Sequence, residues 1–155
     1  MTSPSPVNPI PLSNSLYQQD YYIWLEKMAQ LLRTGNLKEL DRVNLAEEIE
    51  DMGKREKRSV ESNLEIVLMH LLKYKYQPEQ RSNSWRFTLL EHRDRLDKLF
   101  RDSPSLRLHC VDVFADCYGR ARKKAAVETD LSLDTFPEMS PFTPAEALNV
   151  DFLPD

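Results

Sequence analysis

The sequence predicts an all-α fold: a bundle of about four main helices with a long central helix and a mostly extended, proline-rich C-terminal tail. Three observations lead to this class. Apolar residues recur at helical spacing along several long stretches, and no stretch alternates apolar and polar residues as a half-buried strand does. Helix-breaking prolines gather near the end of the chain, at Pro137, Pro141, Pro144 and Pro154.

Length and composition predict one domain with a separate lead. A chain of 155 residues fits a single domain. Residues 1–14 are rich in Pro, Ser and Asn, which predicts a disordered or extended lead and no secretory signal. We expect residues 15–155 to form a single helical domain, in which residues 130–155 are a docking tail. No apolar run approaches the ~20 residues that span a bilayer, so no membrane association is expected.

The first two helices are predicted from their apolar faces and their ends. The first is expected over Leu16–Arg33, and Gly35 suits the position just past its end. The second, central helix is expected to begin at Leu37 or Asp41 and to end at Tyr76, before Pro78. Gly53 costs that helix about 1 kcal/mol relative to alanine, so it predicts a kink or a break. The face of the first helix is Tyr21, Leu25, Met28 and Leu32.

Two further helices and a short tail helix follow. The third is expected over Trp85–Arg101, with Ser82 or Ser84 as its cap. The fourth is expected to start with Ser103 as N-cap and Pro104 at the first helical position, and to end near Thr129. Thr143-Pro144 predicts a short helix over Ala145–Asn149. The apolar residues expected to pin the tail to the helices are Phe136, Phe142, Leu148, Phe152 and Leu153.

His70 is the most informative single residue. It stands in the run Ile66-Val67-Leu68-Met69-His70-Leu71-Leu72, which is apolar on every other side, so we expect the imidazole to be buried and to have a polar partner. A heptad line that passes Glu56, Ser59 and Asn63 reaches His70 and predicts either a polar pocket or a solvated face. In the second case, the buried face turns after Gly53 toward Val60, Leu64, Val67 and Leu71.

Catalytic and metal motifs are incomplete. Glu47, Glu48, Glu56 and His70 suggest a metal-dependent hydrolase, but no acidic residue stands three positions before any histidine. On a straight helix, about 34 Å of rise separates Glu47 from His70. The sequence therefore favours a protein that is not an enzyme, and it predicts no catalytic residue, no metal site and no cofactor.

Basic and aromatic residues in the middle of the chain favour a second alternative, nucleic-acid binding. Residues 53–124 carry 17 basic and 10 acidic side chains, while residues 125–155 carry 7 acidic and no basic ones. Acidic residues are interleaved throughout the basic region, which is equally typical of solvated helix faces. The candidate phosphate-binding residues are Lys54, Arg55, Lys57, Arg58, Lys73, Lys75 and Arg86.

The two cysteines predict a reducing, cytoplasmic environment. Cys110 and Cys117 are seven residues apart, which on one helix separates them by about 10.5 Å. A disulfide requires Cα atoms within about 7 Å, so we expect two reduced core residues.

Several short segments carry the pattern of a known family: Leu16–Trp24, Asn44–Gly53, His70–Lys73, Tyr76–Pro78, Ser84-Trp85, Ser103–Leu106, Phe136-Pro137 and Asp151–Pro154. With them, the chain from Leu16 onward resembles the domain-of-unknown-function family numbered 29, which is largely cyanobacterial. The resemblance implies a compact, helical, cytoplasmic bacterial protein and no particular activity. It also implies that Glu47 and Glu48, His70 and the Arg81–Trp85 corner belong to the family pattern. With Glu56 from the heptad line added, the candidate polar site is Glu47, Glu48, Glu56, His70, Arg81 and Trp85.

We therefore predict a small accessory or regulatory module that acts through protein–protein contacts. The apolar line Leu45–Met52 exceeds what one chain is expected to cover, which favours self-association or a protein partner. Nucleic-acid binding is the alternative, and metal-dependent hydrolysis the second alternative.

Overall fold

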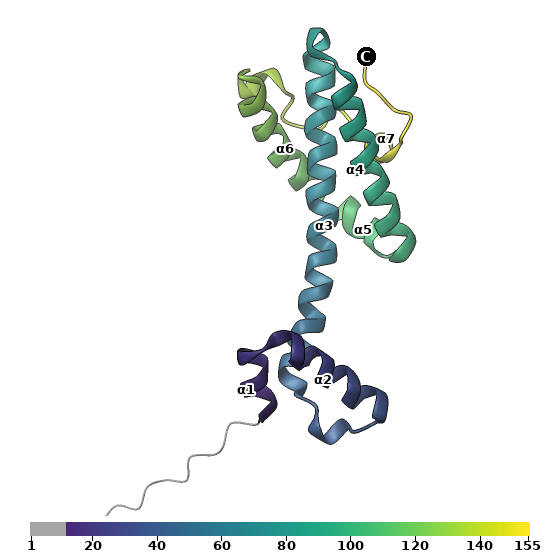
Figure 1. The fold of residues 1–155 in the computed structure, drawn as a ribbon. Coiled ribbons are helices and arrows are strands. Elements are labelled where there is room, and N and C mark those ends of the chain that lie inside the picture. The colour runs from purple at the N-terminus through teal and green to yellow at the C-terminus, as the bar shows by residue number, and fades with distance from the viewer. Residues whose placement is uncertain (1–11) are drawn as a thin grey trace, which may run out of the picture. The chain divides into compact units, whose positions relative to one another are not determined.

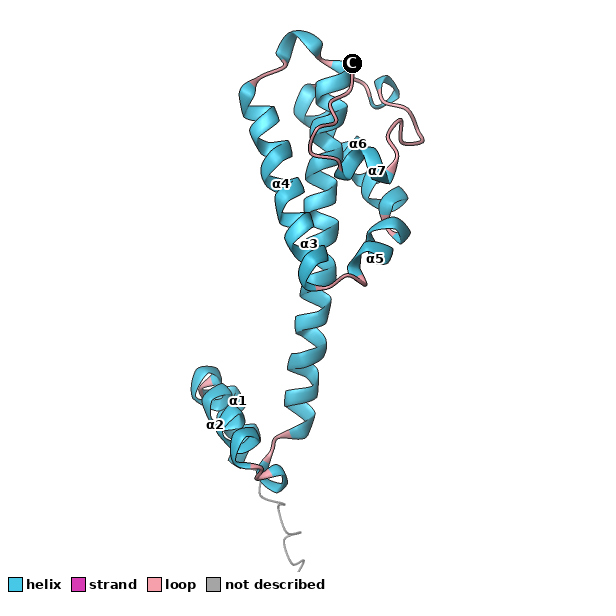
Figure 2. Cartoon of the chain, turned by 90° about the vertical axis from the view of Figure 1, so that its right-hand side faces the viewer, coloured by secondary structure: helices cyan, strands magenta, loops and turns pink. Residues whose placement is uncertain are grey.

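The computed structural model describes residues 12–155, with side chains from Leu16 onward, and the prediction for residues 1–11 lies outside these described residues. Helices, short 3-10 turns and loops make up the described chain, and no strand occurs in it (Figures 1 and 2). The all-α class and the long central helix are thus confirmed. Helix α1 (Leu12–Gln19) begins inside the stretch that was predicted to be a disordered or extended lead.

The chain divides into two compact units, the first ending at Gly53 and the second spanning Lys54–Asp155. The sequence predicted one helical domain over residues 15–155. The boundary between the units falls inside a helix, so no change in loop or linker composition marks it. Each unit has its own hydrophobic core, which among the described side chains consists of three buried residues in the first unit and nineteen in the second.

The first unit contains two helices where the sequence predicted one over Leu16–Arg33. Helix α1 ends at Gln19 and α2 (Tyr21–Thr34) follows directly. The break is at Asp20, whose carboxylate accepts a hydrogen bond from the backbone N–H of Ile23 at 3.1 Å and so caps α2. Gly35 follows α2 in the left-handed conformation, with φ of 74°, as the sequence predicted.

The core of the first unit is built around Trp24. Its ring packs edge-on against Tyr17, with centroids 4.7 Å apart, and its indole N–H donates to Asp41 Oδ2 at 3.2 Å. Asp41 lies between a 3-10 turn (Leu37–Glu39) and the next helix, and also accepts from the backbone N–H of Asn44. Met28 and Leu31 are the other buried apolar side chains among the described residues of this unit.

Helix α3 (Arg42–Tyr76) is uninterrupted through Gly53, where a kink or break had been predicted. A single glycine costs a helix only about 1 kcal/mol, which the surrounding Glu, Lys and Arg residues offset with their good helix propensity. In the second unit, α3 buries Val60, Leu64, Val67 and Leu71. This is the buried face expected in the second of the two alternatives, in which the face turns after Gly53.

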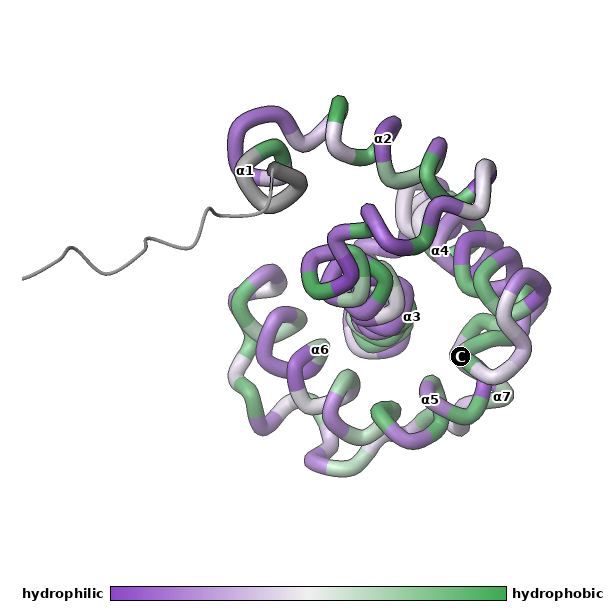
Figure 3. The backbone as a smooth tube through the Cα atoms, turned by 90° about the horizontal axis from the view of Figure 1, so that it is seen from below, coloured by the Kyte–Doolittle hydropathy of each residue, from purple (hydrophilic) through white to green (hydrophobic). Residues whose placement is uncertain are grey.

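Helices α4 (Asn83–Asp102), α5 (Leu106–Asp112) and α6 (Phe114–Thr129) lie around α3 in the second unit (Figure 3). Ser82 caps α4 by accepting from the N–H of Trp85. The predicted fourth helix is divided at Val113, whose ψ of 0° departs from helical values. The predicted cap at Ser103 and Pro104 is wrong, because these residues form a turn and α5 begins at Leu106.

The C-terminal segment is mostly irregular and packs on the second unit's core, as the sequence predicted. It contains a 3-10 turn (Leu133–Thr135) and helix α7 (Pro144–Leu148), which begins with a capping box of Thr143 and Glu146. Phe136 and Phe142 are buried, and the residues that pack against the same core are Leu148, Phe152 and Leu153.

Candidate functional site

The six residues of the predicted polar site belong to different units. Glu47 and Glu48 are part of the first unit, whereas Glu56, His70, Arg81 and Trp85 are part of the second. A shared site would need the chain to reverse near Gly53, and α3 makes no such reversal. Within residues 12–155, no group of three or more His, Cys, Asp or Glu side chains is placed to hold a metal ion. The hydrolase hypothesis therefore has no assembled set of ligands.

Glu48 serves as a structural acceptor in the first unit. Each of its carboxylate oxygens accepts a hydrogen bond of 2.6 Å from a tyrosine hydroxyl, one from Tyr17 and one from Tyr21. The bond to Glu48, together with burial, raises the pKa of Tyr17 to about 12. These contacts fasten the tyrosines of α1 and α2 to the first turns of α3, and Glu47 beside them is exposed.

His70 is buried, as predicted, and its partner is the backbone. Its Nδ1 lies 2.9 Å from the carbonyl oxygen of Ile66, so Nδ1 carries the proton, because a carbonyl only accepts. Burial lowers the pKa of His70 below the ordinary 6.5, and the nearby Lys73 charge acts in the same direction. The bond to Ile66 opposes this lowering only in part, and His70 is a core residue of α3.

Asn63 and His92 form a second polar contact between α3 and α4. Asn63 Nδ2 donates to the carbonyl of Ser59 at 2.8 Å, so its Oδ1 is the atom that faces His92. His92 Nδ1 then donates to that oxygen at 2.7 Å. The predicted line of Glu56, Ser59, Asn63 and His70 is therefore divided: Glu56 is exposed, while Asn63 and His70 are buried.

Lys73, a predicted phosphate ligand, is buried and already paired. Its ammonium lies 2.5 Å from Glu128 on α6 and 4.6 Å from the ring centroid of Trp85 on α4. The ammonium thus links α3 to α6 through the carboxylate and to α4 through the aromatic face. Its position on the buried side of α3 removes Lys73 from solvent and separates it from the exposed phosphate candidates.

Arg81 also has a structural contact. Its Nε donates to the carbonyl of Tyr74 at 2.7 Å, and its guanidinium stacks on the Tyr74 ring at 4.4 Å. This arrangement satisfies a carbonyl near the C-terminus of α3. The remaining phosphate candidates are not gathered: Lys75 is half-buried, Arg86 is exposed on α4, and the exposed basic stretch on α3 is Lys54, Arg55, Lys57 and Arg58.

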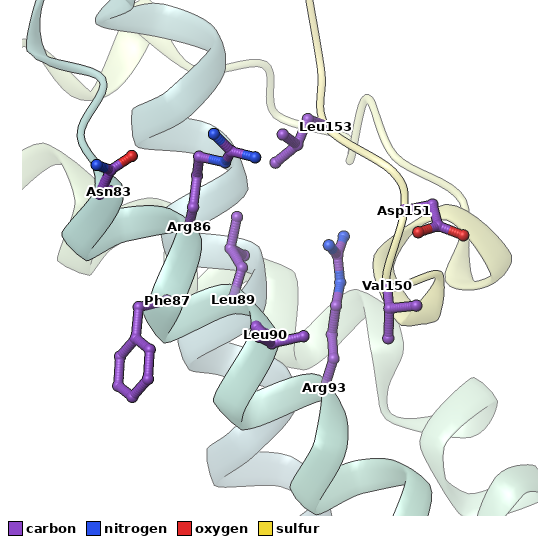
Figure 4. Close-up of a pocket in the computed structure, with 9 residues that line it drawn as sticks. All are labelled: Asn83, Arg86, Phe87, Leu89, Leu90, Arg93, Val150, Asp151 and Leu153. Carbon is purple, nitrogen blue, oxygen red and sulfur yellow. The ribbon is translucent and has the colours of Figure 1, made fainter.

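A cavity of about 500 Å³ lies between α4 and the C-terminal segment (Figure 4). Arg86 and Arg93 project from α4 toward the side where the C-terminal segment passes. The apolar part of the lining includes Phe87, Leu90 and Val150, which are exposed. The full lining is Asn83, Arg86, Phe87, Leu89, Leu90, Arg93, Val150, Asp151 and Leu153.

Arg93 is the residue of this region that sequence reasoning missed. It is 2% exposed, and it donates from Nε to Ala147 O at 2.8 Å, from Nη1 to Phe152 O at 2.9 Å and from Nη2 to Glu146 O at 3.2 Å. Burial lowers its pKa to about 10. The signal was present: Arg93 stands at helical spacing between Leu89 and Leu96, so it occupies a core-facing position of α4.

A second surface lies on α2 in the first unit. Tyr22, Leu25 and Leu32 are 68%, 39% and 49% exposed, and with half-buried Ala29 they follow the 3-4-3 spacing of a heptad stripe. A groove along this face is lined by Leu25, Glu26, Ala29, Gln30 and Arg33. Helix α2 thus has two apolar sides, one buried in its own unit and one uncovered.

Comparison with known proteins gives a family and no activity. A family model with the description "Domain of unknown function DUF29" matches residues 16–153. No curated protein and no solved structure matches the chain. None of the helices in the described part of the chain combines the length and apolar character that crossing a membrane requires.

Proposed function

The chain belongs to the DUF29 family of domains of unknown function, and we propose that it is an accessory or regulatory module that acts through protein–protein contacts. The observation that carries this proposal is the uncovered heptad stripe on α2. A helix of a folded protein normally turns its apolar stripe toward a core, and an uncovered stripe is typical of a helix that pairs with another chain.

The balance of buried and exposed apolar residues in the first unit supports the proposal. Three apolar side chains are buried there, whereas nine large ones are exposed among the described residues. So small a core supplies little stability by itself. Ile49 and Met52, on the line that the sequence singled out, are 62% and 60% exposed, which adds to the apolar surface available for a partner.

A second copy of this chain is the occupant that the stripe fits. In an antiparallel pair of α2 helices, the heptad sets Tyr22 opposite Leu32 of the second copy and Leu25 opposite Ala29, and the small Ala29 permits close approach. Glu26 and Arg33 border the stripe, so this surface has an apolar centre and a charged rim, as protein–protein interfaces do.

Two finer features belong to the same proposal. We infer a cytoplasmic location, because Cys110 and Cys117 are buried free thiols of the kind that a reducing compartment maintains. Nucleic-acid binding is the second candidate, supported by four exposed basic residues within two turns of α3, Lys54, Arg55, Lys57 and Arg58. Phosphate contacts would make the affinity for nucleic acid fall steeply with salt concentration. If the protein retards neither DNA nor RNA in a gel at low salt, nucleic-acid binding is excluded.

Sedimentation velocity of the full chain tests the proposal. We expect a dimer, and we expect Leu32→Glu to raise the dissociation constant at least a hundredfold, because burial of one leucine contributes about 1.5–3 kcal/mol and the change occurs twice. Ile23→Glu is the matched control: Ile23 is 48% exposed but lies off the stripe, so this variant stays dimeric. A wild-type chain that remains monomeric at high micromolar concentration contradicts the proposed pairing.

A further inference from the structure

The cavity between α4 and the C-terminal segment combines two cations with an apolar wall. Arg86 and Arg93 stand seven residues apart on α4, and both side chains extend toward the segment that carries Val150 and Leu153 (Figure 4). The volume of about 500 Å³ is within the range of pockets that take small molecules or a few residues of a peptide.

The charge of Arg93 is buried without a carboxylate bonded to it. Its three hydrogen bonds all go to backbone carbonyls of the C-terminal segment. A guanidinium has five N–H donors, so two remain without an acceptor among the described residues. Carbonyl dipoles offset only part of the cost of a buried cation, and an anion in the adjoining cavity would offset more of it.

Arg86 is the accessible cation of the cavity. It is exposed, and no hydrogen bond or ion pair holds its guanidinium among the described residues. The one acidic side chain of the lining is Asp151. Two arginines and one aspartate leave the lining with one positive charge, which matches a monoanion better than a doubly charged phosphate group.

The apolar residues of the lining indicate what the anion is attached to. Leu90 and Val150 are more than half exposed, and Leu89 and Leu153 line the same cavity. We propose that this cavity binds a carboxylate attached to an apolar chain, with Arg86 as the bidentate partner of the carboxylate and Leu90 and Val150 against the chain. Such a group occurs on a free fatty acid and at the C-terminus of a peptide that ends in an apolar residue.

Titration of the full chain, followed by the methyl resonances of Leu90 and Val150, tests this site. The probes are decanoate, with methyl decanoate as the uncharged control, and acetyl-Ala-Ala-Leu as the free acid and as the amide. Arg86→Gln should weaken binding about tenfold through the loss of one charge-assisted pair. Arg95→Gln, on the same helix but outside the cavity, should leave affinity unchanged, and Asp151→Asn should strengthen it several-fold by removal of the competing carboxylate.

Each outcome has one meaning. Binding of decanoate but not of the peptide acid assigns the site to free acids, and the reverse assigns it to peptide C-termini. If the ester or the amide binds as well as its acid, or if none of the probes binds, the proposal is overturned. Equal loss of affinity in Arg86→Gln and Arg95→Gln would also overturn it, because a general charge effect would then account for the result. The α2 surface lies in the other unit, so dimer formation is a separate readout.

Discussion

The two units use their apolar residues in opposite ways. The second buries nineteen core residues from four of its helices and the C-terminal segment, and exposes eight large apolar side chains. The first buries three and exposes nine among its described residues. The second unit thus completes its core from its own chain, whereas most large apolar side chains of the first unit lie at its surface. The proposed self-association therefore draws on the first unit, while most of the buried core belongs to the second.

Charges are also used differently. The second unit takes charged groups into its interior and matches them there: Lys73 with Glu128, Arg93 with three carbonyls, and Glu65 with Arg120 and Lys124. Among the described side chains of the first unit, the one buried charged residue is Asp41, which accepts from Trp24 and Asn44. All three histidines lie in the second unit, so protonation of histidine changes the stability of that unit alone.

The largest effect should come from Trp24→Ala in the first unit. This change removes the ring that packs on Tyr17 and donates to Asp41, at a cost of about 3–5 kcal/mol. We expect the amides of residues 16–41 to lose protection from hydrogen exchange, because a core of three buried residues contributes too little stability to keep the unit folded after this loss. The amides of α4 and α6 should remain protected.

Leu96→Ala is the matched test in the second unit. Leu96 is fully buried on α4, and its truncation costs about 2–5 kcal/mol. We expect a lower melting temperature with the second unit still folded, since its core is several times larger. Equal loss of protection in both units after either substitution would contradict the division of the chain into units with separate cores.

An intermediate effect is expected from Arg93→Met. The substitution leaves the carbonyls of Ala147 and Phe152 without a donor, while that of Glu146 keeps the N–H of Asn149, and we expect a cost of about 2–3 kcal/mol. Residues 144–153 should gain exchange while α3 and α6 keep their protection. Arg95→Met, an exposed change on the same helix, is the control. Unaltered protection of residues 144–153 in Arg93→Met would mean that apolar contacts alone hold the C-terminal segment.

Local patterns were the predictable part of this fold. Gly35 after α2, Ser82 before α4 and Thr143 before α7 each act within a few residues, and each does what the sequence predicted. His70 was predicted to be buried because its neighbours in the same helix are apolar. The break at Asp20 was missed, since an aspartate inside an apolar-periodic stretch is compatible with either a continuous helix or a new cap.

The candidate sites depended on contacts that local patterns do not encode. Lys73 and Arg86 look alike as basic residues on helices, yet one is buried between Glu128 and Trp85 and the other lines a cavity. The residues that set these two environments lie far along the chain: Glu128 on α6 is about 55 residues after Lys73, and Asp151 in the C-terminal segment is about 65 residues after Arg86. The burial of Arg93 could be predicted from its helical spacing with Leu89 and Leu96. Its acceptors could not, because they are backbone carbonyls, which are the same in every sequence.

The smallest effect is a pH dependence confined to the second unit. Burial holds the pKa of His70 and of His92 below the ordinary 6.5 in the folded state. The unfolded chain therefore takes up these protons first as pH falls, so stability is lost from about pH 6.5 downward until the folded histidines also titrate, by up to about 1.4 kcal/mol per histidine for each pH unit. Urea unfolding of the second unit at pH 7, 6 and 5 measures this slope. His70→Gln should reduce the slope, and the first unit, which has no histidine, should not share it. A slope that persists unchanged in His70→Gln combined with His92→Gln would assign the effect to other groups.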